Sequence, residues 1–206
     1  MIRNDEYVSS WSKLRRAGLK GTDGVMYYGL NGDSPGDGNC YYHALLNSGW
    51  FSLLTSQVMK FKQNLAHFAN DSGREVLELV VNRFAAKDVT PDMVIKNFLE
   101  PNSYSGTLAG IMISAWTGIR IVSMMLDVNG LLRPVEDSFV LLHQVSPEWN
   151  TDENPNTAYV FYHMFGKPLE VTTYGNHYAA LFKMNDKERL HKAQAKRGSK
   201  GSKGMT

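Results

Sequence analysis

Residues 34–46 read Ser-Pro-Gly-Asp-Gly-Asn-Cys-Tyr-Tyr-His-Ala-Leu-Leu, and they contain the only cysteine of the 206-residue chain, Cys40. A Gly- and Asp-rich turn leads directly into an apolar stretch, which predicts that Cys40 begins a helix over about residues 40–47. At a helix N-terminus the pKa of a thiol falls from about 8.5 to roughly 3.5–7.5. A thiolate is a nucleophile at neutral pH, so Cys40 is a candidate catalytic residue. The alternative is a small, buried apolar side chain.

The composition is that of a globular protein, with 43% hydrophobic and 20% charged residues. A chain of this length buries a sizeable core without disulfides or metals, and one cysteine allows neither an internal disulfide nor a Cys-rich zinc site. We therefore expect no cofactor and no metal. We also expect a reducing, intracellular and cytoplasmic location, inside a host cell if the protein is viral or an effector.

The first 18 residues carry charges and no apolar core, so we expect no signal peptide. The most apolar window, residues 107–126, contains Arg120 and a Thr117-Gly118 break. This window predicts a helix, a turn and a strand, and we expect no membrane partner.

The basic residues gather at the C-terminal end of the chain. Residues 183–206 contain eight Lys or Arg and two acidic residues, so the rest of the chain is net acidic. We expect a folded domain over residues 1–183 and a basic, disordered tail over residues 184–206. Loose Lys/Arg clusters are common in tails, so we expect no nucleic-acid partner; the tail could also be a linker. We expect the domain to be a monomer.

Helical periodicity dominates the first half of the chain, and strand-like runs dominate the second half. Apolar spacing predicts helices over residues 5–17, 40–47, 58–68, 76–84, 91–98 and 105–117, with a loop over 19–36. Short β-branched and aromatic runs predict strands over residues 119–126, 138–145, 158–163 and 177–183. This order predicts an α+β fold, an α/β sandwich with a small central β-sheet flanked by helices.

A cysteine nucleophile needs a base, usually histidine, within hydrogen-bond reach. His43 is three residues after Cys40 on the same helix face, which leaves little room for a substrate, so we expect it to be structural or to lie at the rim of the site. His177 follows a Gly175-Asn176 turn and begins an apolar strand, where a side chain can face a cleft on a fixed backbone. It is also 137 residues from Cys40, and catalytic Cys and His are typically distant in sequence.

The run Asp37-Gly38-Asn39-Cys40-Tyr41-Tyr42-His43-Ala44, with the distal Asn176-His177-Tyr178, resembles the ovarian tumour (OTU) family of cysteine proteases. Residues 104–108 and 118–121 resemble the helix and central strand in the middle of that family's domain. The resemblance covers about residues 33–183 and implies a papain-like OTU fold. It also implies a thiol protease that acts as a deubiquitinase (a ubiquitinyl hydrolase), with conjugates of ubiquitin or a ubiquitin-like modifier as partners.

The resemblance implies a role for each matching residue. Cys40 is the nucleophile, and His177 is the general base. Asp37 matches the motif aspartate, and its turn supplies backbone N–H groups of Asp37, Gly38, Asn39 and Cys40 to the oxyanion hole. Each such donor is worth roughly 2.7–4 kcal/mol, because it already points to where negative charge develops.

The sequence departs from the family pattern at Ala179. Many family members carry Asp or Asn two residues after the histidine, where it orients the imidazole. Ala179 cannot do so, and strand alternation points Asn176 to the opposite face. Asp33 is our candidate for the orienting residue; the alternatives are that Asp33 is a plain turn residue and that the site is a dyad.

Other functions stay open at this stage. Without a third catalytic residue, the protein could be a slow enzyme or a catalytically weak, ubiquitin-binding pseudo-enzyme. A viral-type protease that processes a polyprotein is another reading, with the basic tail as an interdomain stretch. A phosphate-binding or calcium-binding loop over residues 33–39 is a poor fit. These residues lack the Gly-Lys-Ser/Thr ending of a Walker motif and the ligand spacing of an EF-hand.

Overall fold

In the computed structural model of the chain, residues 5–30, 34–51, 54, 57–103, 106–149, 156–165 and 175–183 are described. Asp33 and the basic tail lie outside these residues. The elements are α1 (Asp5–Arg16), β1 (Leu19–Lys20), β2 (Met26–Gly29), α2 (Cys40–Asn47), α3 (Val58–Asn70), α4 (Arg74–Phe84), α5 (Pro91–Leu99), α6 (Thr107–Thr117), β3 (Arg120–Leu126), β4 (Leu132–Asp137), α7 (Ser138–His143), β5 (Thr157–Phe165) and β6 (Gly175–Lys183).

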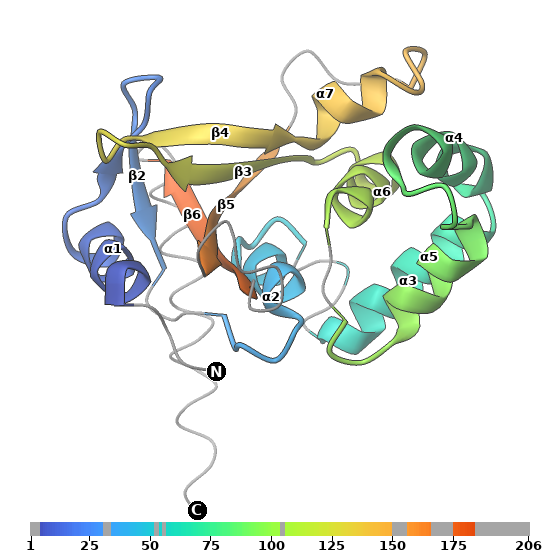
Figure 1. Ribbon diagram of the computed structural model, residues 1–206, viewed down its shortest axis with the longest axis horizontal. Helices are drawn as coiled ribbons and strands as arrows, with labels where there is room; N and C mark the ends of the chain where they lie inside the picture. The colour runs from blue at the N-terminus through green and yellow to red at the C-terminus, as the bar shows by residue number, and fades with distance from the viewer. Residues whose placement is uncertain are drawn as a thin grey trace, which may run out of the picture.

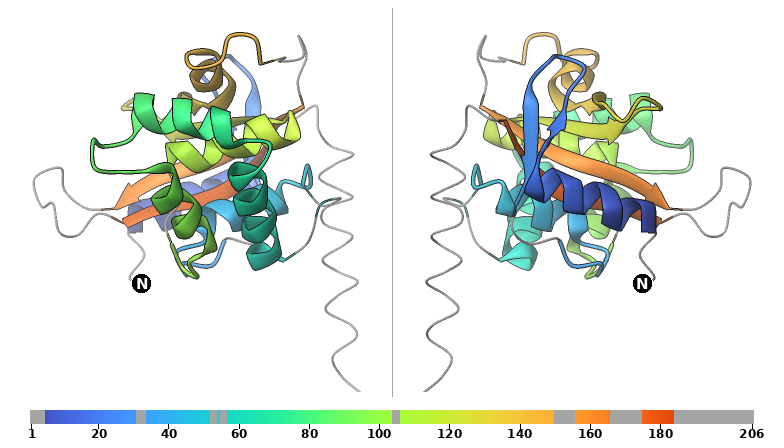
Figure 2. Two further views of the ribbon diagram at one scale, coloured as in Figure 1. Left: turned by 90° about the vertical axis from the view of Figure 1, so that its right-hand side faces the viewer. Right: turned by 90° about the vertical axis from the view of Figure 1, so that its left-hand side faces the viewer.

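The six described strands form one mixed sheet in the order β1-β2-β6-β5-β3-β4 (Figure 1). Strands β3 and β5 are parallel, and the other neighbours are antiparallel. Helices α3 to α6 lie on one side of β5 and β6, and α1 lies on the opposite side (Figure 2). This arrangement confirms the α+β fold with a central sheet flanked by helices.

Two main apolar clusters hold these layers together. The larger cluster joins α2 to the helical layer and includes Cys40, Tyr41 and Tyr178. The smaller one packs Trp11 of α1 against Phe161 of β5, with ring centroids 6.5 Å apart. Because α2 packs against both β5 and β6, the start of this helix lies within the main core. No helix among the described residues is long and apolar enough to span a bilayer.

The expected strand over residues 138–145 is wrong, because Ser138–His143 forms the helix α7. The carboxylate of Asp137 caps this helix: its Oδ1 accepts hydrogen bonds from the backbone N–H groups of Phe139 (3.1 Å) and Val140 (3.4 Å). Asp137 also pairs with Arg120 of the neighbouring strand, which anchors the cap to the sheet. The capping carboxylate favours a helix here, although the β-branched and aromatic composition of the segment favours a strand.

The expected loop over residues 19–36 contains the two strands β1 and β2, and β4 was not expected. Strand β2 is only four residues long, and it lies between the two-residue β1 and β6, which is about 150 residues away in the chain. Strand β4 lies at the sheet edge and contains Pro134 beside a register shift, a position that tolerates a residue without an N–H group. Tertiary pairing decides these short strands, so local composition does not reveal them.

Candidate active site

The thiol of Cys40 lies at the first residue of α2, the position expected from the sequence. Its residue is only 2% exposed. The preceding Asn39 occupies the N-cap position, and its backbone oxygen accepts the first helical hydrogen bond from the N–H of His43 (3.0 Å). Cys40 therefore lies at the positive end of the helix dipole.

Asp37 holds the turn that precedes Cys40. One carboxylate oxygen, Oδ1, accepts a hydrogen bond from the backbone N–H of Asn39 (2.9 Å), and the other, Oδ2, lies 3.1 Å from Nε2 of His43. His43 therefore has the structural role expected of it. Burial raises the pKa of Asp37, but the hydrogen bonds from Asn39 and His43 outweigh burial and leave this pKa lowered.

The contact between Asp37 and Asn39 removes one of the four backbone donors expected in the oxyanion hole. A backbone N–H group is a single donor, and that of Asn39 already donates to the Asp37 carboxylate. The backbone N–H groups of Asp37, Gly38 and Cys40 stay as the predicted donors to an oxyanion.

Gly38 brings the turn against the segment that follows α5. Its φ angle is +83°, and a Cβ atom at this position would lie 2.2 Å from the backbone oxygen of Asn102. The side chains also meet there, because Nδ2 of Asn39 donates to Oδ1 of Asn102 (3.3 Å). Only glycine allows both this backbone conformation and this close approach.

The structure adds one residue that the sequence analysis missed. The ammonium group of Lys62, on α3, donates a hydrogen bond to Oδ1 of Asn39 (2.9 Å). Lys62 is fully buried, between Phe61 and Leu65 in a helix whose apolar residues face the core. A lysine on the apolar face of an amphipathic helix was the available signal, because a buried charge requires specific partners.

His177 lies on β6, is 2% exposed, and pairs in register with His163 of β5. The next residue, Tyr178, packs its ring edge-on against Tyr41, the residue after Cys40, with centroids 4.8 Å apart. The backbone segments that carry Cys40 and His177 are therefore neighbours, as α2 and β6 are (Figure 1).

Strand alternation places His177 on the same face of β6 as Ala179. Ala179 is fully buried in the smaller apolar cluster, so its methyl group packs and forms no hydrogen bond with the imidazole. His163 lies directly across from His177 and therefore shares this face, which the sequence alone did not indicate. The predicted orienting residue, Asp33, is outside the described residues.

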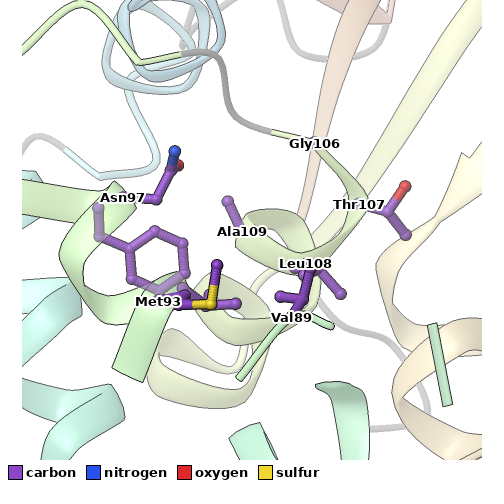
Figure 3. A pocket seen from close by; sticks show the side chains of 9 residues that line it. Val89, Met93, Asn97, Gly106, Thr107, Leu108 and Ala109 are labelled. Carbon is purple, nitrogen blue, oxygen red and sulfur yellow. The ribbon is translucent and has the colours of Figure 1, made fainter. Parts of the chain in front are cut away.

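A cavity of about 320 Å³ lies between α5 and α6 (Figure 3). Its lining is largely apolar and includes Val89, Met93 and Leu108. Neither Cys40 nor His177 lines it. In the described part of the chain, no three His, Cys, Asp or Glu side chains gather in a way that could hold a metal ion.

The comparisons with known proteins give structural neighbours only. No family model and no curated protein matches the sequence. Among solved structures, the chain is similar to the Hazara virus OTU bound to ubiquitin, at 16% identity and a TM-score of 0.44, over 77% of this chain and 82% of that chain. The OTU domain of OTUD1 has 12% identity and a TM-score of 0.48, over 76% of this chain and 85% of that chain.

An OTU deubiquitinase from Wolbachia pipientis wMel is similar at 13% identity and a TM-score of 0.45, over 81% of this chain and 95% of that chain. These structural neighbours are OTU domains, the family that residues 37–44 and 176–178 resemble.

Replacing Gly38 with alanine should destabilise the protein more than the same change at Gly24. Both glycines have a positive φ, +83° and +81°, so both variants carry the roughly 1–2 kcal/mol cost of a left-handed alanine. Only at Gly38 does the new Cβ meet backbone, since nothing lies within 4 Å at Gly24. Urea denaturation measures the difference in unfolding free energy, and equal losses in the two variants would contradict the close approach to Asn102.

Replacing Asp37 with asparagine should change how stability depends on pH. The folded-state pKa of Asp37 is lowered, so its carboxylate stabilises the fold above its unfolded pKa of about 3.9, and this contribution is lost as pH falls through the folded pKa. Asp37→Asn should therefore be less stable than the wild type at neutral pH, with the gap closing in acid. The exposed Asp88 supplies the control, Asp88→Asn. A gap that stays constant from pH 7 to acid would rule out the carboxylate as its source.

Proposed function

We propose that the protein is an OTU-type thiol isopeptidase that removes ubiquitin or a ubiquitin-like modifier from proteins. Cys40 is the nucleophile, and His177 is the general base. The observation that carries the proposal is the placement of Cys40 at the start of α2, directly after the Asp37–Asn39 turn. The contact between Tyr41 and Tyr178 brings together the two segments that carry the proposed catalytic residues.

In the proposed reaction, the imidazole of His177 takes the proton of the Cys40 thiol. The thiolate then attacks the carbonyl carbon of the isopeptide bond, and the carbonyl oxygen becomes an oxyanion that accepts hydrogen bonds from the turn. As the intermediate collapses, the carbon–nitrogen bond breaks, and the imidazolium donates its proton to the leaving lysine amine. An acyl-enzyme thioester between Cys40 and the modifier stays behind.

The second half of the reaction releases the modifier. His177 accepts a proton from a water molecule that attacks the thioester carbonyl, a second oxyanion forms in the same place, and the carbon–sulfur bond breaks. The modifier leaves with a free C-terminal carboxylate, and the proton returns to the sulfur. The enzyme thus ends the cycle in its starting state without a metal or a cofactor in any step.

The proposed mechanism needs a fixed orientation of His177, which Ala179 cannot supply through a hydrogen bond. Burial of His177 and its registered pairing with His163 restrict the imidazole by packing. Asp33 is the sequence-based candidate for an orienting carboxylate. An enzyme without an orienting carboxylate retains the nucleophile and the base, so its catalysis is slower but follows the same route.

Capture by an electrophilic probe tests this function directly. A probe built on the C-terminus of ubiquitin or a ubiquitin-like modifier should form a covalent adduct with the wild-type chain and none with Cys40→Ser. His177→Ala should slow capture by about 10²-fold or more, because it removes the base. His67 is exposed on α3, so His67→Ala should be captured at the wild-type rate. Absence of capture of the folded wild-type protein by every modifier probe would overturn the proposal.

A further inference from the structure

Lys62 is a buried cation whose hydrogen-bonding capacity is completely used. Its residue has no exposed surface, and burying an ammonium group is costly unless each donor finds an acceptor. An ammonium group has three donors. They reach Oδ1 of Asn39 (2.9 Å), the backbone oxygen of Glu100 (2.6 Å) and Oγ of Ser103 (3.1 Å).

These acceptors come from two segments that are far apart in sequence. Asn39 belongs to the turn before α2, and Glu100 and Ser103 belong to the segment after α5. Oγ of Ser103 donates in turn to the backbone oxygen of Asn97 (2.7 Å), which ties this segment to the last turn of α5. Lys62 thus joins α3, the end of α5 and the turn before α2 at one point.

The contact with Lys62 determines what the Asn39 side chain does. An N-cap asparagine usually accepts a hydrogen bond from the first helical turn, but Asn39 forms no such bond. Its Oδ1 accepts from Lys62, and its Nδ2 donates to Asn102. The side chain therefore anchors the turn to the rest of the molecule and does not cap α2.

Two further interactions involve the Lys62 ammonium group, one with an aromatic ring and one with a carboxylate. Its ammonium group lies 5.1 Å from the ring centroid of Tyr42, a fully buried residue of α2, in the geometry of a cation–π contact. Burial lowers the pKa of Lys62, and the negative charge of Asp37, on the same turn, opposes this shift by favouring the protonated lysine. The turn is therefore held on one side by His43 and on the other by Lys62.

We propose that Lys62 is a positioning residue for the oxyanion hole, an inference that rests on the proposed function. Asn39 immediately precedes Cys40, so the peptide plane that carries the Cys40 N–H moves with Asn39. By fixing the Asn39 side chain, the ammonium group keeps that N–H and those of Asp37 and Gly38 in one orientation. Because an oxyanion forms only along the reaction path, Lys62 acts on the rate of the chemical step and not on modifier binding.

The test uses the full chain, a fluorogenic amide at the C-terminus of ubiquitin, and the variants Lys62→Met and Lys62→Gln. Met keeps the chain length without donors, and Gln keeps a donor without the charge. We expect kcat to fall by about 10- to 100-fold with KM changed less than about twofold, because small displacements of donors are costly. The control Lys60→Met alters an exposed lysine of the same helix and should retain both constants.

Hydrogen exchange provides a second readout that needs no substrate. Exchange in residues 37–42 should rise in Lys62→Met and stay at the wild-type level in Lys60→Met. If the wild type hydrolyses no modifier amide and is captured by no modifier probe but exchange rises as expected, the proposed function fails, and the link between Lys62 and the turn stands. Folded Lys62 variants with a wild-type kcat would overturn the positioning role, as would an equal loss in kcat and in modifier affinity. Should Lys62→Met fail to fold, Lys62→Gln decides by the same measurements.

Discussion

The hydrogen bonds that hold residues 37–39 are the constraint on which this site depends. The Asp37 carboxylate accepts a hydrogen bond from the backbone N–H of Asn39 within the turn, and it also contacts the imidazole of His43 on α2. The Lys62 ammonium binds the Asn39 side chain from the core side. The proposed nucleophile at the helix N-terminus needs such support, because two of the three predicted oxyanion donors, the N–H groups of Asp37 and Gly38, belong to the turn.

The surrounding fold explains how this turn is kept in place. Helix α2 is eight residues long, too short to be stable in isolation, and it gains its stability from packing against β5 and β6 and from its buried aromatic side chains. Tyr41 reaches Tyr178 on the sheet, and Tyr42 reaches Phe61 on α3. His177 directly precedes Tyr178 in the chain, and Lys62 directly follows Phe61.

The sequence predicts those parts of the site whose residues are contiguous in the chain, and it does not predict contacts between distant residues. The position of Cys40 follows from a turn and an apolar run that are contiguous, and the α+β class follows from the order of the helical and strand-like periodicities. The helix over Ser138–His143 was missed because one capping residue, Asp137, decided it. Lys62 was missed because its partners come from residues 39, 100 and 103, which only the folded chain brings together.

The most direct measurement of the central claim is the rate at which a small alkylating reagent modifies Cys40 at neutral pH, compared between the wild type and His177→Ala. If the imidazole of His177 takes the proton of the Cys40 thiol, the variant should be alkylated more slowly than the wild type, because its thiol has lost its base. Equal rates in the two folded proteins would contradict the proposed pairing of Cys40 with His177.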